Sequence, residues 1–221
     1  MSSRRLVHTP ANTEFPQTPV SVPDDSSVTL SGASEATVDL TKLLNTGDLG
    51  RGWTEVPVAE LGGGTTSLQG MLTGLKVTPA AWVSKLAIPV GYQDQAHRVF
   101  RLGNGTEGPY LATGIALFSS PQHARAALAK AQSRVRNCRH VSISIDRGSA
   151  DALITKLKTT RLGDQRVGYS IRAIVAGFIP AHGQVIIVRK GNTVVAVAHG
   201  GIGTTSARPA KAAAAIAASR I

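Results

Sequence analysis

The segment Val185–Ala198 reads VIIVRKGNTVVAVA, and this stretch decides the fold. Two runs rich in Val and Ile flank Gly191-Asn192, a dipeptide typical of a two-residue hairpin turn. With Lys190 opposite Thr193, the period-two geometry of strands fixes the register of the whole hairpin. This register pairs Val188 with Val195, Ile186 with Val197 and Gln184 with His199. Both faces of the hairpin are then apolar, so we expect it to be central in its sheet and covered on both sides.

Two predicted helices can provide that cover. Ser120-Pro121 begins the first, because Ser caps helices well and Pro is tolerated where a first-turn N–H has no partner. Apolar residues then recur at helical spacing: Ala124, Ala127, Leu128, Ala131 and Val135. The second helix runs through the Ala-rich end of the chain, with Pro209 in its first turn. The predicted fold class is α+β, a mostly antiparallel sheet with a central hairpin at 183–200, flanked by helices at about 120–137 and 206–220, with a cleft on one side.

Further strands are predicted on either side of the first helix. The segments 95–102 and 110–118 form a second hairpin, turned by Gly103-Asn104-Gly105. Alternating apolar residues predict two more strands, at 140–145 and 165–178. Weaker patterns predict a helical turn at 39–44 closed by Gly47, a first strand at 54–59 and a short helix at 79–86.

Composition divides the chain into a tail and one domain. Residues 1–37 are rich in Pro, Ser and Thr without apolar periodicity, which predicts a disordered tail. Residues 38–221 are expected to form a single α+β ligand-binding domain. The formal net charge is +11, and the tail contributes −2 of it, so the domain carries +13. That balance favours anionic partners. The basic residues are scattered rather than clustered with aromatics, which argues against a nucleic-acid partner.

Several classes of chemistry are excluded or left without a motif. Cys138 is the only Cys, so no internal disulfide or Cys-based zinc site can form. No nucleotide or nucleophile-elbow motif is present, and the glycines at 200–203 fit an ordinary strand-to-helix turn. We therefore expect no cofactor and no metal, and no catalytic residue can be assigned. No apolar run is long enough for a membrane span, and Met1-Ser-Ser-Arg-Arg does not begin a signal peptide. The domain is then extracytoplasmic if a leader has been removed, and otherwise cytoplasmic.

The hairpin register suggests where a ligand could bind. It places His182 and His199 on one face, with Gln184 between them, as expected at the mouth of a pocket. The alternative is a pair of histidines at an exposed sheet edge. Polar-tipped aromatics can line a ligand site or fill the core, and a strand Arg that points inward needs an anion. The candidate ligand-binding residues are Trp82, Tyr92, Arg98, Tyr110, Tyr169, Arg172, His182, Gln184 and His199.

Three stretches resemble the PknH-like extracellular sensor domains of mycobacterial Ser/Thr kinases and the related sensor lipoproteins. They are Leu43–Trp53 (LLNTGDLGRGW), the capped helix from Phe118 to Cys138, and Lys190–Val197 (KGNTVVAV). The resemblance spans about residues 38–221 and implies a sheet with a concave ligand cleft. That family is stapled by disulfides, whereas Cys138 has no partner Cys here, as a move into the cytoplasm would allow.

Three functions of different classes remain open from the sequence. The first is a sensor-like domain that binds a small apolar ligand, either neutral or anionic, and does no chemistry of its own. The alternative is an intracellular biosynthetic enzyme of the same fold, a cyclase that folds a hydrophobic polyketide-like substrate in its cavity. A purely structural or partner-binding protein is the third possibility.

Overall fold

The computed structural model describes residues 37–57, 76–78, 92–104, 109–137, 139–145, 148–175, 177–203 and 206–221. The predicted helix at 79–86, the candidate residue Trp82 and the single Cys138 lie outside the described residues. So do residues 1–36 of the predicted tail.

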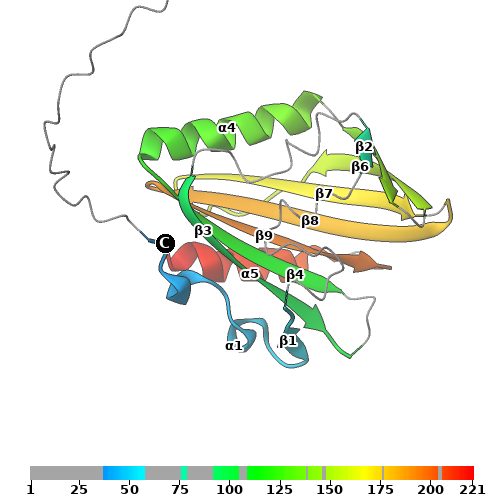
Figure 1. The fold of residues 1–221 in the computed structure, drawn as a ribbon, viewed down its shortest axis with the longest axis horizontal. Coiled ribbons are helices and arrows are strands. Elements are labelled where there is room, and N and C mark those ends of the chain that lie inside the picture. The colour runs from blue at the N-terminus through cyan, green and yellow to red at the C-terminus, as the bar shows by residue number, and fades with distance from the viewer. Residues whose placement is uncertain are drawn as a thin grey trace, which may run out of the picture. The chain divides into compact units, whose positions relative to one another are not determined.

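Within the described residues, nine strands form one antiparallel sheet (Figure 1). They are β1 Trp53–Glu55, β2 Lys76–Thr78, β3 Tyr92–Leu102, β4 Tyr110–Phe118, β5 His140–Ile145, β6 Gly148–Lys156, β7 Gln165–Val175, β8 Ile179–Lys190 and β9 Thr193–Ile202. Their spatial order is β1-β3-β4-β9-β8-β7-β6-β5-β2, so the β8–β9 hairpin lies near the middle. The fold class is therefore α+β with a mostly antiparallel sheet, as the sequence predicts.

The β8–β9 hairpin has the predicted register. Lys190 pairs with Thr193 around the turn, and Gln184 pairs with His199 six residues further from it. Gly191 occupies the turn with φ of 59°, a conformation that Gly adopts without steric cost. Because the side-chain period of a strand is two, this register fixes which residues share a face along both strands.

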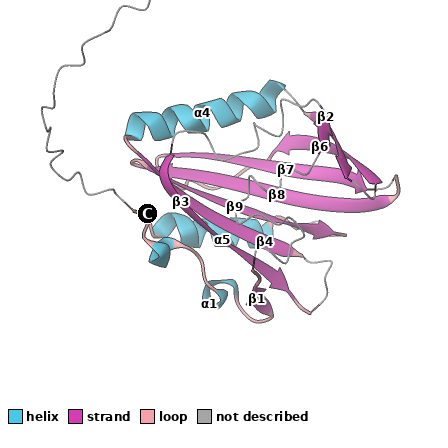
Figure 2. Ribbon diagram, viewed as in Figure 1, coloured by secondary structure: helices cyan, strands magenta, loops and turns pink. Residues whose placement is uncertain are grey.

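Helices cover this hairpin on both faces (Figure 2). The helix α5, Arg208–Ser219, packs against β8 and β9, where Ile186 and Val197 join its buried alanines in one cluster. The helix α4, Pro121–Asn137, packs against β4, β7, β8 and β9, where Ala124 clusters with Val194. We call these two sides of the sheet the α5 face and the α4 face.

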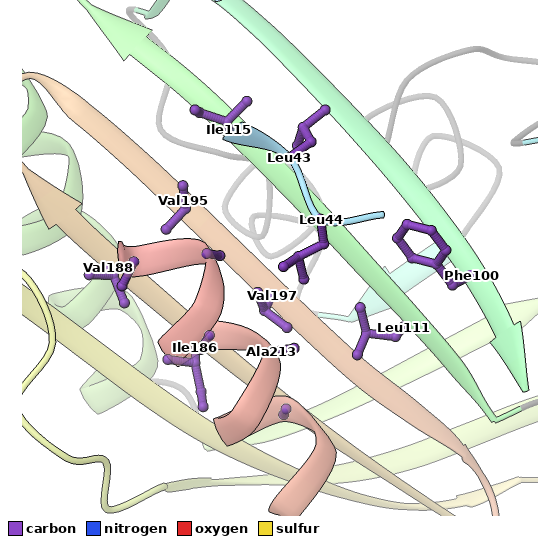
Figure 3. Packing of buried hydrophobic residues seen from close by; sticks show 14 residues of the cluster. Leu43, Leu44, Phe100, Leu111, Ile115, Ile186, Val188, Val195, Val197 and Ala213 are labelled. Atoms are coloured by element: carbon purple, nitrogen blue, oxygen red, sulfur yellow. The ribbon is translucent and has the colours of Figure 1, made fainter. Parts of the chain in front are cut away.

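The α5 face holds the larger apolar cluster (Figure 3). Small side chains let α5 lie close to the strands, and its buried residues are Ala210, Ala213, Ala214, Ala217 and Ala218. Phe100 and Leu111 extend the cluster across β3 and β4. Leu43 and Leu44 of the N-terminal segment complete the cluster. Arg220 ties this segment to the end of the chain by donating a hydrogen bond to the Leu43 carbonyl at 2.8 Å.

The helix that covers the α4 face begins with the predicted N-cap, Ser120. The Oγ of Ser120 accepts a hydrogen bond from the backbone N–H of His123 at 3.2 Å, and Pro121 is the first helical residue. Leu128 is fully buried among Val141, Ile154, Val167 and Tyr169. Three residues of the predicted apolar stripe, Ala124, Ala127 and Leu128, are therefore buried between α4 and the sheet.

The N-terminal segment departs from the prediction. In place of one helical turn closed by Gly47, there is a 3-10 turn, η1, at Leu40–Lys42, and then a helix, α1, at Thr46–Leu49 that contains Gly47. The cause is local, because Asn45 and Asp48 form a capping box that starts a new helix.

The strands also differ from the prediction in two places. The strand predicted at 165–178 ends at Val175, because Gly177 and Phe178 belong to the turn that begins β8. The strand β6 was not predicted at all, although Ala150, Ala152 and Ile154 alternate with Asp151 and Leu153 along it.

Candidate functional site

The sheet separates the predicted site residues into two groups. Directly paired residues in antiparallel strands point to the same face, so the register assigns each side chain. The α5 face carries Arg98, Arg172, His182, Gln184 and His199. The α4 face carries Tyr92, Tyr110 and Tyr169. The two groups cannot line one pocket, because the sheet lies between them.

A hollow of about 430 Å³ lies on the α5 face where β5, β6, β7 and β8 run side by side. Register places eight of its lining residues on this face: His140, Ser142, Asp151, Leu153, Arg172, Ile174, Pro180 and His182. Two of the predicted site residues, Arg172 and His182, are among them. The hollow is partly open to solvent.

The hollow combines the Arg172 cation with an apolar wall. Arg172 of β7 lies directly opposite His182 of β8, and no described residue forms an ion pair with Arg172. Ile174 and Pro180 form the next pair towards the end of the sheet. A molecule with an anionic group and an apolar body would find a partner for each part here.

Asp151 is the acidic group of the hollow. Its carboxylate accepts a hydrogen bond from the Ser142 hydroxyl at 2.5 Å, across the β5–β6 pair. Asp151 lies opposite Ile174, and is therefore diagonal to Arg172 rather than paired with it. Within the described residues, Asp151 and Arg172 form no ion pair.

Of the predicted histidine cluster, His182 lies in the hollow, whereas Gln184 and His199 are buried. His199 is only 4% exposed, and its Nδ1 lies 3.0 Å from Gln184 Oε1. Because an amide oxygen only accepts, this contact makes Nδ1 the protonated nitrogen of a neutral His199. The rings of Trp53 and His199 meet in an edge-to-face arrangement, with 6.2 Å between their centroids and 64° between their planes. His199 is therefore buried, and it does not belong to an exposed pair of histidines at a sheet edge, which is the alternative that the sequence left open.

Burial lowers the pKa of His199, because a desolvated site disfavours the imidazolium. The unfolded chain, with a pKa near 6.5, takes up a proton there that the folded protein resists. The folded state therefore loses stability as the pH falls below about 6.5. We expect urea unfolding to show less stability at pH 5.5 than at pH 7.5 because of this group. His199→Gln should remove that part of the difference, and His123→Gln, at an exposed position, should not.

The other described candidate residues do not line the hollow. Arg98 donates to the Leu44 carbonyl at 3.4 Å and lies 3.7 Å from Glu55, so its charge is partnered within the N-terminal segment. Tyr169 is 8% exposed and packs under α4, and burial raises its pKa to about 12. Tyr92 packs beside Phe118, and Tyr110 lies opposite Gly200. Core filling explains Tyr92 and Tyr169.

Sequence reasoning missed three polar residues of the hollow, His140, Ser142 and Asp151. His140 begins β5, and its position beside Leu153 follows only from the pairing of β5 with β6. The alternation along 148–156 would have revealed β6, and with it the Ser142–Asp151 pair. Among the described residues, no group of three His, Cys, Asp or Glu side chains could hold a metal ion. None of the described helices is both long and apolar enough to cross a bilayer.

Comparison with solved structures identifies the fold. The extracellular domain of PknH from Mycobacterium tuberculosis superposes with a TM-score of 0.55 at 13% identity, over 81% of this chain and 93% of that domain. The chain thus has the PknH-like sensor-domain fold. An uncharacterised protein from Mycobacterium smegmatis aligns at 14% identity over 76% of this chain and 85% of its own, with a TM-score of 0.35, which supports no argument. No protein-family model matches the chain, and no curated protein matches it.

Proposed function

We propose that this chain is a ligand-binding, sensor-like domain that holds a small apolar anion in the hollow of β5–β8. The observation that carries the proposal is Arg172, which has no ion-pair partner among the described residues and lies in the hollow opposite His182. The PknH-like fold supports a binding role, and the net charge of +11 supports an anion.

The polar part and the apolar part of the hollow would each contact a different part of the ligand. A carboxylate beside Arg172 gains charge-assisted hydrogen bonds from the guanidinium, and the apolar body of the ligand covers Ile174, Pro180 and Leu153. Arg172 is exposed, so solvent screens its attraction, and we expect it to contribute only about 1 kcal/mol. The apolar contact should supply the larger part of the affinity.

Decanoate and decan-1-ol make a matched pair of probes, because they differ only in the charged group. Amide NMR titration should show decanoate shifting residues of β5–β8 around Arg172. Arg172→Met should weaken decanoate binding about three- to tenfold and leave decan-1-ol binding unchanged within twofold.

Arg125→Met is the control, since Arg125 lies exposed on α4, on the other face of the sheet. It removes the same charge from the chain and should change neither affinity. Equal loss of decanoate binding in both variants would mean that only the net charge matters. Equal loss of both probes in Arg172→Met would mean that Arg172 shapes the hollow and does not select an anion. Either result contradicts the proposal.

The shape of the hollow favours binding over the cyclase alternative. A cyclase that folds a polyketide-like chain needs a dry, enclosed cavity, whereas this hollow is partly open. An extracytoplasmic location is part of the proposal, because the solved domain with this fold is an extracellular one.

A further inference from the structure

One end of the sheet exposes an unusual amount of apolar surface. Phe178 is 76% exposed, Ile202 48% and Ile174 45%. Among the described residues, five large hydrophobic side chains are exposed, and these are three of them. We call Ile174, Phe178 and Ile202 the hairpin tip.

Strand pairing places the three residues of the hairpin tip at one end of the sheet, with Ile174 on the α5 face and Ile202 on the α4 face. Phe178 lies in the turn between β7 and β8, and Ile174 pairs with Pro180 just after that turn. Ile202 ends β9 opposite Ala181, and the next N–H, of Gly203, donates to the Pro180 carbonyl at 3.0 Å. The β7–β8 turn and the end of β9 therefore project at the same end of the sheet (Figure 1).

The Arg172 cation lies one strand step behind the hairpin tip. Arg172 and His182 occupy the pair two residues before Ile174 and two after Pro180 on the same face. The exposed Arg208 begins α5 six residues after Ile202. Among the described residues, Asp151 is an acidic group beside the tip, opposite Ile174, and it already accepts a hydrogen bond from Ser142. Apolar side chains in front with cations behind match the layers of an anionic lipid surface, where acyl chains lie beneath phosphates.

We propose that the hairpin tip docks on an anionic lipid bilayer, with Phe178 inserted among the acyl chains and Arg172 at the level of the phosphates. A protein partner fits less well, because a stable interface buries on the order of 1,000 Å² or more, which three side chains cannot supply. Insertion of a single aromatic residue supported by cations requires far less surface. Docking would also place the hollow beside the lipid, since Ile174 belongs to both.

Vesicle co-sedimentation of the full chain tests the docking. We expect binding to phosphatidylcholine vesicles that contain about one-third phosphatidylglycerol, and much weaker binding to pure phosphatidylcholine. Phe178→Ser should lower partitioning about tenfold or more. Leu40→Ser is the matched control, because Leu40 is 56% exposed in η1, away from the tip, and its loss should change partitioning less than twofold.

A second variant reports on insertion directly. The fluorescence of Phe178→Trp should shift to the blue on the mixed vesicles and be quenched by brominated acyl chains, whereas Leu40→Trp should show neither change. Unchanged partitioning of Phe178→Ser, or equal effects at Phe178 and Leu40, would overturn the proposal. Light scattering that shows Phe178-dependent self-association without vesicle binding would also overturn it. Decanoate binding by Phe178→Ser separates the two proposals, because the docking account expects that binding to persist.

Discussion

Val194→Asp and Val197→Asp are each expected to lower the free energy of unfolding by about 4 kcal/mol or more, enough to unfold a marginal domain. The two residues lie on the same strand, three apart, and point to opposite faces of the sheet. Val197 is fully buried towards α5, and Val194 is 3% exposed beneath α4. An unpaired carboxylate on either face would have to be buried or protonated, because a helix excludes water from both.

Urea unfolding monitored by circular dichroism measures both effects. Thr155→Asp is the control, because Thr155 is an exposed strand residue and the same change should cost less than about 1 kcal/mol there. Large losses at both valines are the signature of a hairpin covered on two sides. A large loss at Val197 with a small one at Val194 would show that α4 does not cover the sheet in solution.

Gly163→Ala is expected to cost at least about 3 kcal/mol, and the reason is steric as well as conformational. Gly163 has φ of 55°, and a Cβ there would lie 2.5 Å from the carbonyl oxygen of Arg189 and 2.7 Å from Cγ1 of Val188. Two hydrogen bonds of the neighbouring Asp164 hold Gly163 this close to β8. The N–H of Asp164 donates to the same Arg189 carbonyl at 2.8 Å, and the Asp164 carboxylate accepts from the Gly191 N–H at 2.9 Å.

Gly177→Ala provides the comparison, because Gly177 has φ of 79° but no atom within 4 Å of its would-be Cβ. That variant carries the conformational cost without the clash and should lose about 1 kcal/mol. Thermal or urea unfolding of the two variants measures the difference. Equal losses would mean that the loop before β7 can move away from β8, and that its contact with the hairpin turn does not hold the fold.

The central hairpin could be predicted in detail because its signals are local. A two-residue turn fixes register, and register fixes which side chains share a face, so Gln184 was correctly placed opposite His199. The flanking helices were predictable for the same reason, since Ser120-Pro121 and the Ala-rich run carry their own start signals and periodicity.

The candidate site could be predicted only in part, because it depends on pairings between distant strands. The sequence placed His182 beside Gln184 and His199, which belong to one hairpin. It could not place Asp151 or Ser142, since β6 was missed and the β5–β6 register sets their contact. Nor could it separate Tyr169 from His182, because the β7–β8 register decides which face each occupies. Long-range register carries no local sequence signal.

A crystal structure with 10-bromodecanoate tests the central claim most directly, because the anomalous signal of bromine locates one end of the ligand independently of the protein. We expect the carboxylate within hydrogen-bonding distance of Arg172 and the bromine over the apolar wall of Ile174 and Pro180. A ligand bound on the α4 face near Tyr169, or a hollow that stays empty when the ligand saturates the protein in solution, would contradict the account.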